Sequence, residues 1–498
     1  MSTFSPGLTI LHANHPEDLR ELVLDLIRRH PLAPLQNEVF LVQSNGMAQW
    51  LRLRLAQDDG LGIAAALDMQ MPSRFLWQAY RAVLGAEAVP ATSPFDKQPL
   101  IWRLMRLLPA CLTQAPFAPL RDYLADDSDL RKRYPLAERL ADLFDQYQVY
   151  RADWLEDWAE GRDVLRDPQG QILPLPPEQR WQPHLWRFLR DDIGAAHHQG
   201  SRAAVHPRFL QALRDRHPQT QVRGLPPRLI VFGISALPLQ ALEALDALSR
   251  VIPVFICVNN PCRYYWADII EDRQLLRFEQ RRHALKAGLA GLDAEQLHAR
   301  VNPLLAAWGR QGRDYIGMLY AYDQSHAGAQ QVDLFLDRLD PAKPCLLHAL
   351  QQGILDLAPA PHGDAPRQAV SPEDTSIRFV HAHSRQREVD ILHDHLLDLF
   401  AHHPDLQPRD VMVMVPDISL YAPHVEAAFG YLASDDPRHI PYTLADRPAR
   451  AHNPLLMALE RLLDLPDARL GASDLLDLLE VAAFRARFGI QAEDLARL

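Results

Sequence analysis

Apolar runs and amphipathic stretches alternate at the start of the chain. Residues 8–13 (LTILHA) form a short apolar run typical of a buried strand, and residues 16–29 carry leucines at helical spacing. A second buried-strand pattern, VFLVQ at 39–43, ends in the turn sequence SNG and is followed by an amphipathic stretch at 47–55. This alternation predicts a parallel sheet with helices on both of its faces.

A helical insertion is predicted next, because amphipathic helices replace the strand pattern from about residue 80 to 220. A loop-rich stretch at 166–183 interrupts them. The sheet pattern returns at 228–237 (RLIVFGISAL) and, after a helical stretch, at 251–258 (VIPVFICV). Within the latter run, Pro253 suits the start of a strand better than its middle.

A second α/β unit is predicted beyond a proline-rich linker at 358–374. Apolar runs at 376–382 (SIRFVHA) and 410–415 (DVMVMV) read as strands on either side of an amphipathic helix. Before the linker, residues 271–300 are charged and poor in β-branched side chains, which indicates a surface insertion. The helical pattern continues to Leu498, so we expect the chain to be cut short.

Two α/β units in series, the first with a helical insertion, form the layout of a superfamily 1 helicase. The expected fold class is therefore α/β: a helicase-like parallel-sheet domain with a degenerate P-loop and a helical insertion, followed by the start of a second helicase-like α/β domain. The expected boundaries are 1–345 for the first domain (sheet subdomain 1–80 and 221–345, insertion about 81–220), 346–375 for the linker and 376–498 for the second domain.

Composition indicates a globular protein of more than one domain. The chain has 498 residues, of which 48% are hydrophobic and 23% charged, and this balance excludes disorder. Four cysteines are too few for a disulfide scaffold. The start of the chain does not resemble a signal peptide, and no run approaches the ~18 apolar residues of a membrane span. We expect a cytoplasmic protein that does not cross a membrane.

Lysine is scarce, and this scarcity decides two questions of chemistry. A P-loop needs a lysine after a glycine to reach the nucleotide phosphates. None of the four lysines follows a glycine, so the turn at Gly46 has the shape of a P-loop without its cation, and ATP hydrolysis by this chain alone is not expected. No lysine stands two positions after a carboxylate, which excludes a PD-(D/E)xK nuclease. The four positions are Lys97, Lys132, Lys286 and Lys343.

Other reactive constellations are weaker. Two histidine pairs at i,i+2 spacing, His381 with His383 and His393 with His395, are compatible with a metal site on a strand. With 22 histidines in the chain, surface positions are the simpler interpretation, and no metal is expected. A G-x-S-x-G nucleophile elbow is absent from the sequence.

Two segments carry patterns that suit single-stranded nucleic acid. In ERLADLFDQYQVYR, Asp142, Asp145 and Gln146 lie beside an apolar helical stripe. Carboxylates repel phosphates but accept hydrogen bonds from base amines, so such a face would read bases, although an ordinary solvated face has the same pattern. The net charge of −11 favours an enclosed channel over an open surface. The aromatic segment NNPCRYYW (259–266) is either a stacking platform or part of the core.

Several long segments of the sequence resemble the RecC family, the gamma subunits of exodeoxyribonuclease V (RecBCD). They are LVQSNGMAQWL, ADLFDQYQVYRADWL, FGISALP, NPCRYYW, NPLLAAWGRQGRDYI and SRQREVDILHDHLL, which occur in one order between residues 41 and 397. RecC proteins are considerably longer, so the resemblance implies an N-terminal portion that lacks the nuclease-like C-terminal domain.

The resemblance implies a function that agrees with the scarcity of lysine. RecC is similar to a helicase with decayed ATPase motifs, and this chain would be a non-catalytic scaffold in the repair of double-strand breaks by recombination. It would split duplex DNA ends, pass single strands to RecB-like and RecD-like partners and recognise Chi in one strand. The chain itself would hold no cofactor, because the partner subunits use ATP and magnesium.

The resemblance also implies which residues read Chi. Asn45 and Met71 stand where the family pattern has Thr and Leu, so the recognised octamer is expected to differ. Glutamine can bond bidentately with adenine, and tryptophan can stack on a base. The full set is Gln43, Asn45, Gln49, Met71, Trp77, Asp142, Leu143, Asp145, Gln146, Arg151 and Arg202.

Two other functions stay open at this stage. One is an active ATP-dependent helicase or nuclease with unconventional motifs. The other is a pure interaction subunit that reads no bases. Single-strand-stimulated ATP turnover separates the first from a scaffold, and the response to substitutions at Asp145 and Gln146 separates the second.

Overall fold

A computed structural model describes most of the chain, which divides into two compact units, Met1–Ser376 and Ile377–Leu498. Each unit is described by itself. The predicted surface insertion at 271–300 lies outside the described residues, as does the middle of the predicted linker, 360–368. The described ranges are 4–57, 59–126, 131–167, 170–217, 222–267, 302–325, 330–337, 344–359, 369–445, 453–469 and 471–497.

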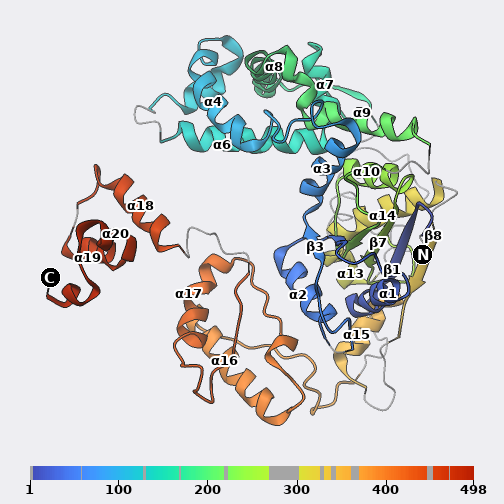
Figure 1. The fold of residues 1–498 in the computed structure, drawn as a ribbon, viewed down its shortest axis with the longest axis vertical. Coiled ribbons are helices and arrows are strands. Elements are labelled where there is room, and N and C mark those ends of the chain that lie inside the picture. Colours follow the sequence, from blue (N-terminus) through green and yellow to red (C-terminus); the bar gives the residue numbers. More distant parts are fainter. Residues whose placement is uncertain are drawn as a thin grey trace, which may run out of the picture. The chain divides into compact units, whose positions relative to one another are not determined.

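Six parallel strands form one sheet in the first unit, in the order β3-β2-β6-β7-β1-β8 (Figure 1). This sheet confirms the predicted α/β class, and β7 begins at Pro253 as expected. The strands are β1 (Gly7–Ala13), β2 (Glu38–Leu41), β3 (Leu67–Gln70), β6 (Leu229–Phe232), β7 (Pro253–Asn259) and β8 (Gln330–Leu334).

Helices cover both faces of the sheet. The alternation of β2 shows why: Phe40 packs toward one face of the sheet, and Val39 and Leu41 pack toward the other. The first face is covered by α1 (Pro16–Arg29) and α2 (Asn45–Leu55). The second is covered by α3 (Pro72–Leu84), α9 (Arg202–Arg214), α10 (Leu239–Ser249), α13 (Pro303–Trp308) and α14 (Arg310–Ser325).

The helical insertion has a core of its own. Phe95, Phe117, Phe144 and Trp158 are fully buried in it. A short antiparallel hairpin, β4 (Val164–Arg166) with β5 (Ile172–Pro174), lies where the sequence suggested only a loop. The helices are α4 (Lys97–Cys111), α5 (Ala118–Tyr123), α6 (Arg133–Tyr150), α7 (Ala152–Ala159) and α8 (Trp181–Ile193).

Helices form the described part of the second unit. Val389, Leu396 and Phe429 join α16 to α17 in a small core. Helix α15, in the first unit, occupies the first part of the range that the sequence assigned to the linker. The bounds are α15 (Leu346–Leu355), α16 (Arg385–His402), α17 (Ile418–Phe429), α18 (Pro454–Asp464), α19 (Ala472–Glu480) and α20 (Ala482–Phe488).

The two strands predicted for the second unit, at 376–382 and 410–415, are wrong. Both runs are described, and neither pairs with another segment as a strand. Several of their apolar side chains face solvent, with Phe379 89% and Met414 86% exposed, although Val411 packs against the core of α16 and α17. A strand is stable only beside hydrogen-bonded neighbours, and two short runs alone make a marginal sheet.

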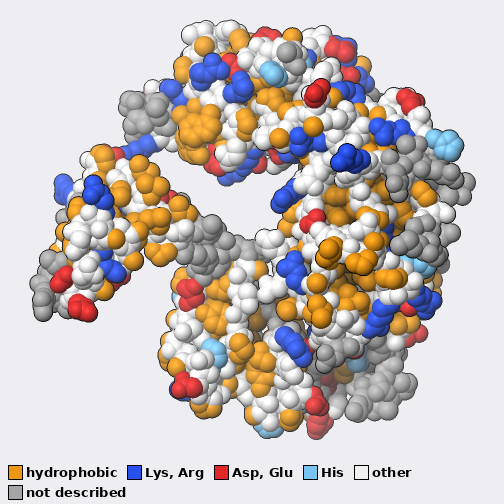
Figure 2. Space-filling view, in the orientation of Figure 1, with side chains coloured by type: hydrophobic (Ala, Val, Ile, Leu, Met, Phe, Trp, Pro, Cys, Tyr) orange, Lys and Arg blue, Asp and Glu red, His pale blue; other side chains and the backbone are white. Residues whose placement is uncertain are grey.

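Exposed apolar side chains also gather over α18 (Figure 2), including Leu455 and Leu463. Within the described residues, none of the helices is both long enough and apolar enough to cross a bilayer.

Candidate nucleic-acid interface

The turn between β2 and α2 lies at a switch point of the parallel sheet, where successive strands are added in opposite directions from two neighbouring strands. From β2 the chain continues to β3 on one side, and from β6 it continues to β7 on the other. Ligands of open parallel sheets bind in the crevice at such a point, at the carboxyl ends of the strands. Gln43 crosses this crevice, because its Oε1 accepts hydrogen bonds from the backbone nitrogen (3.2 Å) and Oγ (3.0 Å) of Ser235.

This turn has the outline of a phosphate-binding loop but not its chemistry. Ser44 caps α2, and its Oγ accepts the hydrogen bond of the Met47 backbone nitrogen at 3.2 Å, so one first-turn donor is already used. The residue after Gly46 is Met47 rather than lysine. Lys97 pairs instead with Asp142 in the insertion, with Nζ and Oδ1 3.0 Å apart.

The other predicted residues of this region surround the carboxyl edge. Asn45 and Gln49 are exposed on α2, and Met71 is half-buried directly before α3. Trp77 is half-buried on α3, where its Nε1 donates to the backbone oxygen of Pro90 at 3.0 Å. The ring therefore serves partly as core and partly as surface. We call Gln43, Asn45, Gln49, Met71 and Trp77 the edge group.

A second set of predicted residues meets on the insertion. Asp142 accepts a hydrogen bond from Nε2 of Gln146 at 3.1 Å in addition to the Lys97 contact. Arg202, at the start of α9, pairs with Oδ1 of Asp145 at 3.3 Å and with Oδ1 of Asp96 at 3.1 Å. We call Asp142, Asp145, Gln146 and Arg202 the insertion group. It presents carboxylate acceptors, an amide and a guanidinium side by side, which suits the edges of bases.

The edge group and the insertion group are joined by the segment 90–96. Trp77 donates to Pro90 at the start of this segment, and Asp96 at its end pairs with Arg202. Midway, Oγ of Ser93 donates to the backbone oxygen of Gly200 at 2.6 Å. Trp77, from the edge group, and the insertion group are therefore parts of one bonded arrangement.

Two predicted residues stand apart from this arrangement. Arg151, at the end of α6, binds Asp153 with its Nε (3.0 Å) and Nη2 (2.7 Å) and lies 4.0 Å over the ring of Trp154. Leu143 is half-buried beside the core of the insertion. The structure does not bring Arg151 into the insertion group.

Asp96, Lys97 and Gln148 belong to the arrangement but escaped the sequence reasoning. Gln148 is fully buried and donates from Nε2 to the backbone oxygen of Phe95 at 2.8 Å, while its Oε1 accepts from the backbone nitrogen of Arg202 at 3.3 Å. Lys97 could have been singled out from the sequence, since it is one of only four lysines. No sequence pattern pointed to Asp96, because its partner Arg202 is more than a hundred residues away.

Burial raises the pKa of Asp145, and the nearby Arg202 opposes this shift only in part. The folded chain therefore holds the Asp145 proton more tightly than the unfolded chain. Stability from this site is present below the ordinary pKa of 3.8 and is lost as the pH rises through the raised pKa. We expect the melting temperature of Asp145→Asn, which cannot ionise, to rise relative to that of the parent as the pH increases above the ordinary pKa of 3.8.

Asp157→Asn is the control of opposite sign. Hydrogen bonds from Arg166 and Arg162 hold the pKa of Asp157 below its usual range. Its stabilising contribution is present above the ordinary pKa and is lost as the pH falls. The melting temperature of Asp157→Asn should therefore fall further below that of the parent as the pH rises. Equal slopes for the two variants would contradict this assignment.

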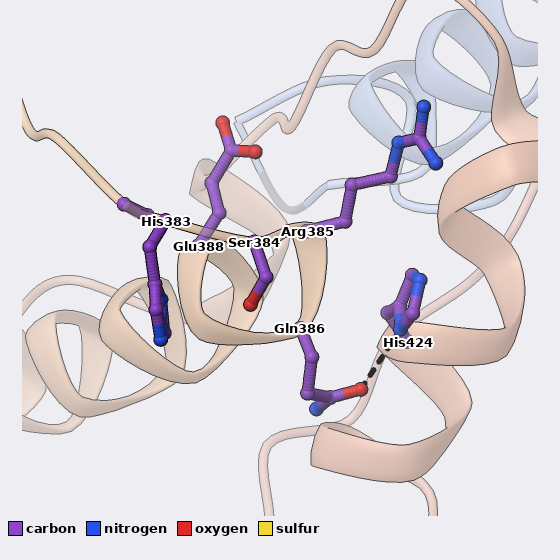
Figure 3. A pocket seen from close by; sticks show the side chains of 7 residues that line it. His383, Ser384, Arg385, Gln386, Glu388 and His424 are labelled. Carbon is purple, nitrogen blue, oxygen red and sulfur yellow. Dashed lines mark hydrogen bonds between the residues drawn. The ribbon is translucent and has the colours of Figure 1, made fainter.

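The remaining motifs do not form a reactive site. His383 lines a pocket of about 560 Å³ at the start of α16, where Gln386 bonds to His424 (Figure 3). Among the described residues, no group of three or more histidine, cysteine or acidic side chains is placed to hold a metal ion. In NNPCRYYW, Trp266 is core, whereas Tyr264 and Tyr265 are about half exposed.

Comparison with known proteins identifies relatives along the whole chain. A family model described as "RecC, N-terminal domain" matches residues 8–357, and one described as "RecBCD enzyme subunit RecC fourth domain" matches residues 452–498. The RecBCD enzyme subunit RecC of Escherichia coli K12 is 40% identical over 520 residues, which cover 99% of this chain and 44% of that protein.

Other bacteria have similar proteins. The RecBCD enzyme subunit RecC of Haemophilus influenzae is 36% identical over 98% of this chain and 45% of its own length. That of Mycobacterium tuberculosis H37Rv is 30% identical over 93% of this chain and 40% of its own length. This chain thus spans less than half the length of these relatives. Because the first family match alone covers well over half of its residues, the chain belongs to the RecC family.

Proposed function

We propose that this chain is the DNA-reading portion of a non-catalytic scaffold subunit in a RecBCD-type helicase and nuclease (exodeoxyribonuclease V). It splits duplex ends, channels single strands and recognises a Chi-type sequence in one of them. RecB-like and RecD-like partners form the rest of the assembly and supply the ATP- and magnesium-dependent chemistry. The relatives are RecBCD enzyme subunits, which supports membership of such a complex.

One observation carries the proposal: the insertion group places base-directed acceptors beside a guanidinium. Asp142 and Asp145 cannot track a phosphate backbone, because like charges repel. They can accept hydrogen bonds from exocyclic amines, and Gln146 offers both a donor and an acceptor. Together with the edge group, which contributes Trp77 for stacking, they form what we call the reading face.

The reading face predicts a sequence preference that depends on Gln146. We expect single strands selected from a random octamer library on the full chain to share a preferred sequence. Gln146→Ala removes both amide contacts, so the preferred octamer should lose roughly tenfold of its advantage over the library average, since a bidentate base contact contributes about 1–3 kcal/mol of discrimination. Sequencing of the bound fraction measures this ratio.

Gln211→Ala is the matched control. Gln211 is also an exposed helical glutamine, bonded through Nε2 to an aspartate four residues away, Asp215, just as Gln146 is bonded to Asp142. It lies outside the reading face, so its removal should leave the selected sequence unchanged. An equal loss in both variants, or a parent chain without any preferred octamer, would refute base reading and favour a pure interaction subunit.

An ATP-driven motor is the rival function, and an ATPase assay separates it from a scaffold. The scaffold predicts no single-strand-stimulated hydrolysis by the purified chain, because no ammonium group follows Gly46 to reach the terminal phosphates. Turnover that a substitution within this chain abolishes would overturn the proposal.

A further inference from the structure

Two buried polar side chains, Tyr80 and His206, and the partly exposed Glu243 form a continuous hydrogen-bonded relay across three helices. Oη of Tyr80, on α3, lies 2.9 Å from Nδ1 of His206, on α9. Nε2 of His206 lies 2.9 Å from Oε2 of Glu243, on α10. Tyr80 and His206 are each only 5% exposed. Polar groups buried to this degree are retained at a cost unless they are fully bonded, so their pairing requires a structural explanation.

The relay is chemically complete. The Glu243 carboxylate only accepts hydrogen bonds, so Nε2 of His206 carries the hydrogen and Nδ1 is free to accept from the Tyr80 hydroxyl. Burial raises the pKa of Tyr80, which keeps its phenol protonated and therefore a donor. Each member thus fixes the orientation of the next.

Two of these helices also carry members of the reading face. Trp77 lies three residues before Tyr80 on α3, and their rings are 6.1 Å apart in an edge-to-face arrangement. Arg202 lies four residues before His206 on α9, so both pairs share a helix face. Trp77 belongs to the edge group and Arg202 to the insertion group.

These contacts close a ring. It runs from Trp77 through Pro90 and Ser93 to Gly200, along α9 to His206, and back through Tyr80 to Trp77. The segment 90–96 links α3 to α9 on one side of the ring, and the hydrogen bond between Tyr80 and His206 links them on the other. The relay adds directional hydrogen bonds to the apolar contact between α3 and α9, where the rings of Tyr80 and Phe209 lie 4.7 Å apart.

We propose that Tyr80, His206 and Glu243 are positioning residues that hold the edge group and the insertion group in register, an inference that rests on the proposed function. None of the three touches the DNA. Their role is to set the distance between Trp77 and Arg202, and hence the fit of successive bases.

The test uses the full chain with the random octamer library and, separately, a mixed-sequence single strand for overall affinity. Tyr80→Phe removes one hydroxyl and leaves Nδ1 of His206 buried without a donor. We expect the advantage of the preferred octamer to fall roughly tenfold, which corresponds to about 1.4 kcal/mol, while overall affinity stays within about twofold. A purely structural defect would lower both together.

Two further variants keep the inference falsifiable if Tyr80→Phe fails to fold. Glu243→Gln retains an oxygen that accepts a hydrogen bond from His206, so this variant should keep the octamer preference. Glu243→Ala removes that acceptor and should lose the preference. Tyr315→Phe is the matched control, because Tyr315 is a buried tyrosine whose hydroxyl has no hydrogen-bond partner among the described residues. It should retain the preference.

The outcomes separate the two levels of the account. A preference that survives Tyr80→Phe and Glu243→Ala overturns the positioning role alone, as does an equal loss in Tyr315→Phe. A parent chain that binds all octamers alike overturns the proposed base reading and this inference with it.

Discussion

Arg228→Ala will destabilise the first unit by about 3–5 kcal/mol, the usual effect of leaving a buried charge without its partner. Nε of Arg228 donates to Oε2 of Glu38 at 2.9 Å, a second nitrogen contacts the other carboxylate oxygen, and Nη1 donates to the backbone oxygen of His30 at 2.7 Å. The side chains of Arg228 and Glu38 are only 3% and 8% exposed. Truncation therefore strands the Glu38 carboxylate in the sheet. Urea denaturation followed by circular dichroism measures the change.

Position explains why this pair has so large an effect. Glu38 begins β2 and Arg228 directly precedes β6, so the ion pair joins neighbouring strands from either side of the insertion. Replacing both residues, as Glu38→Leu with Arg228→Met, should restore most of the stability, because no charge is then left unpaired.

Arg29→Ala is the control for this prediction. Arg29 pairs with Asp25 on the surface of α1, where both side chains are more than half exposed, and such pairs contribute about 0–1 kcal/mol. A loss of similar size in Arg228→Ala would contradict the buried-pair assignment.

Arg202→Ala will weaken single-strand binding by at least roughly tenfold and will remove most of the octamer preference. Arg202 neutralises Asp96 and Asp145, with ion pairs of 3.1 and 3.3 Å. Without it, Lys97 alone would offset these two carboxylates and Asp142, so the reading face would repel phosphates. The guanidinium is also lost as a contact for guanine or phosphate. Fluorescence anisotropy with a selected octamer measures both effects.

Arg208→Ala provides the comparison on the same helix. Arg208 is partly exposed on α9, donates to the backbone oxygen of Gln199 at 3.2 Å and is not a member of the reading face. Its loss removes the same formal charge, so the two variants share any long-range electrostatic effect. Equal weakening by both substitutions would mean that Arg202 acts through net charge rather than through the site.

The central strands were predictable from sequence because they are apolar throughout. Strands buried on both faces must be so, as LIVF in β6 and PVFICV in β7 show. The edge strands were missed for the converse reason: β3 (LDMQ) and β8 (QQVDL) carry polar side chains that an edge tolerates. The apolar run DVMVMV was wrongly predicted to be a strand, because a local pattern does not reveal whether a neighbouring strand exists.

The site was predictable only where its residues are close in sequence. Asp142, Asp145 and Gln146 share one helix face by spacing alone. The approach of Arg202 to Asp96, like the relay from Tyr80 to His206, depends on how α9 packs against α3 and α6, which no local pattern encodes. The resemblance to RecC implied Arg202 and its partner Asp145, but not the second partner, Asp96.

Photocrosslinking of a single strand to the full chain tests the reading face most directly. With a photoreactive base at each position of the selected octamer in turn, we predict crosslinks to Trp77 and to residues 142–146, at different octamer positions. A bound strand that labels neither, and crosslinks elsewhere on the chain, would contradict the account.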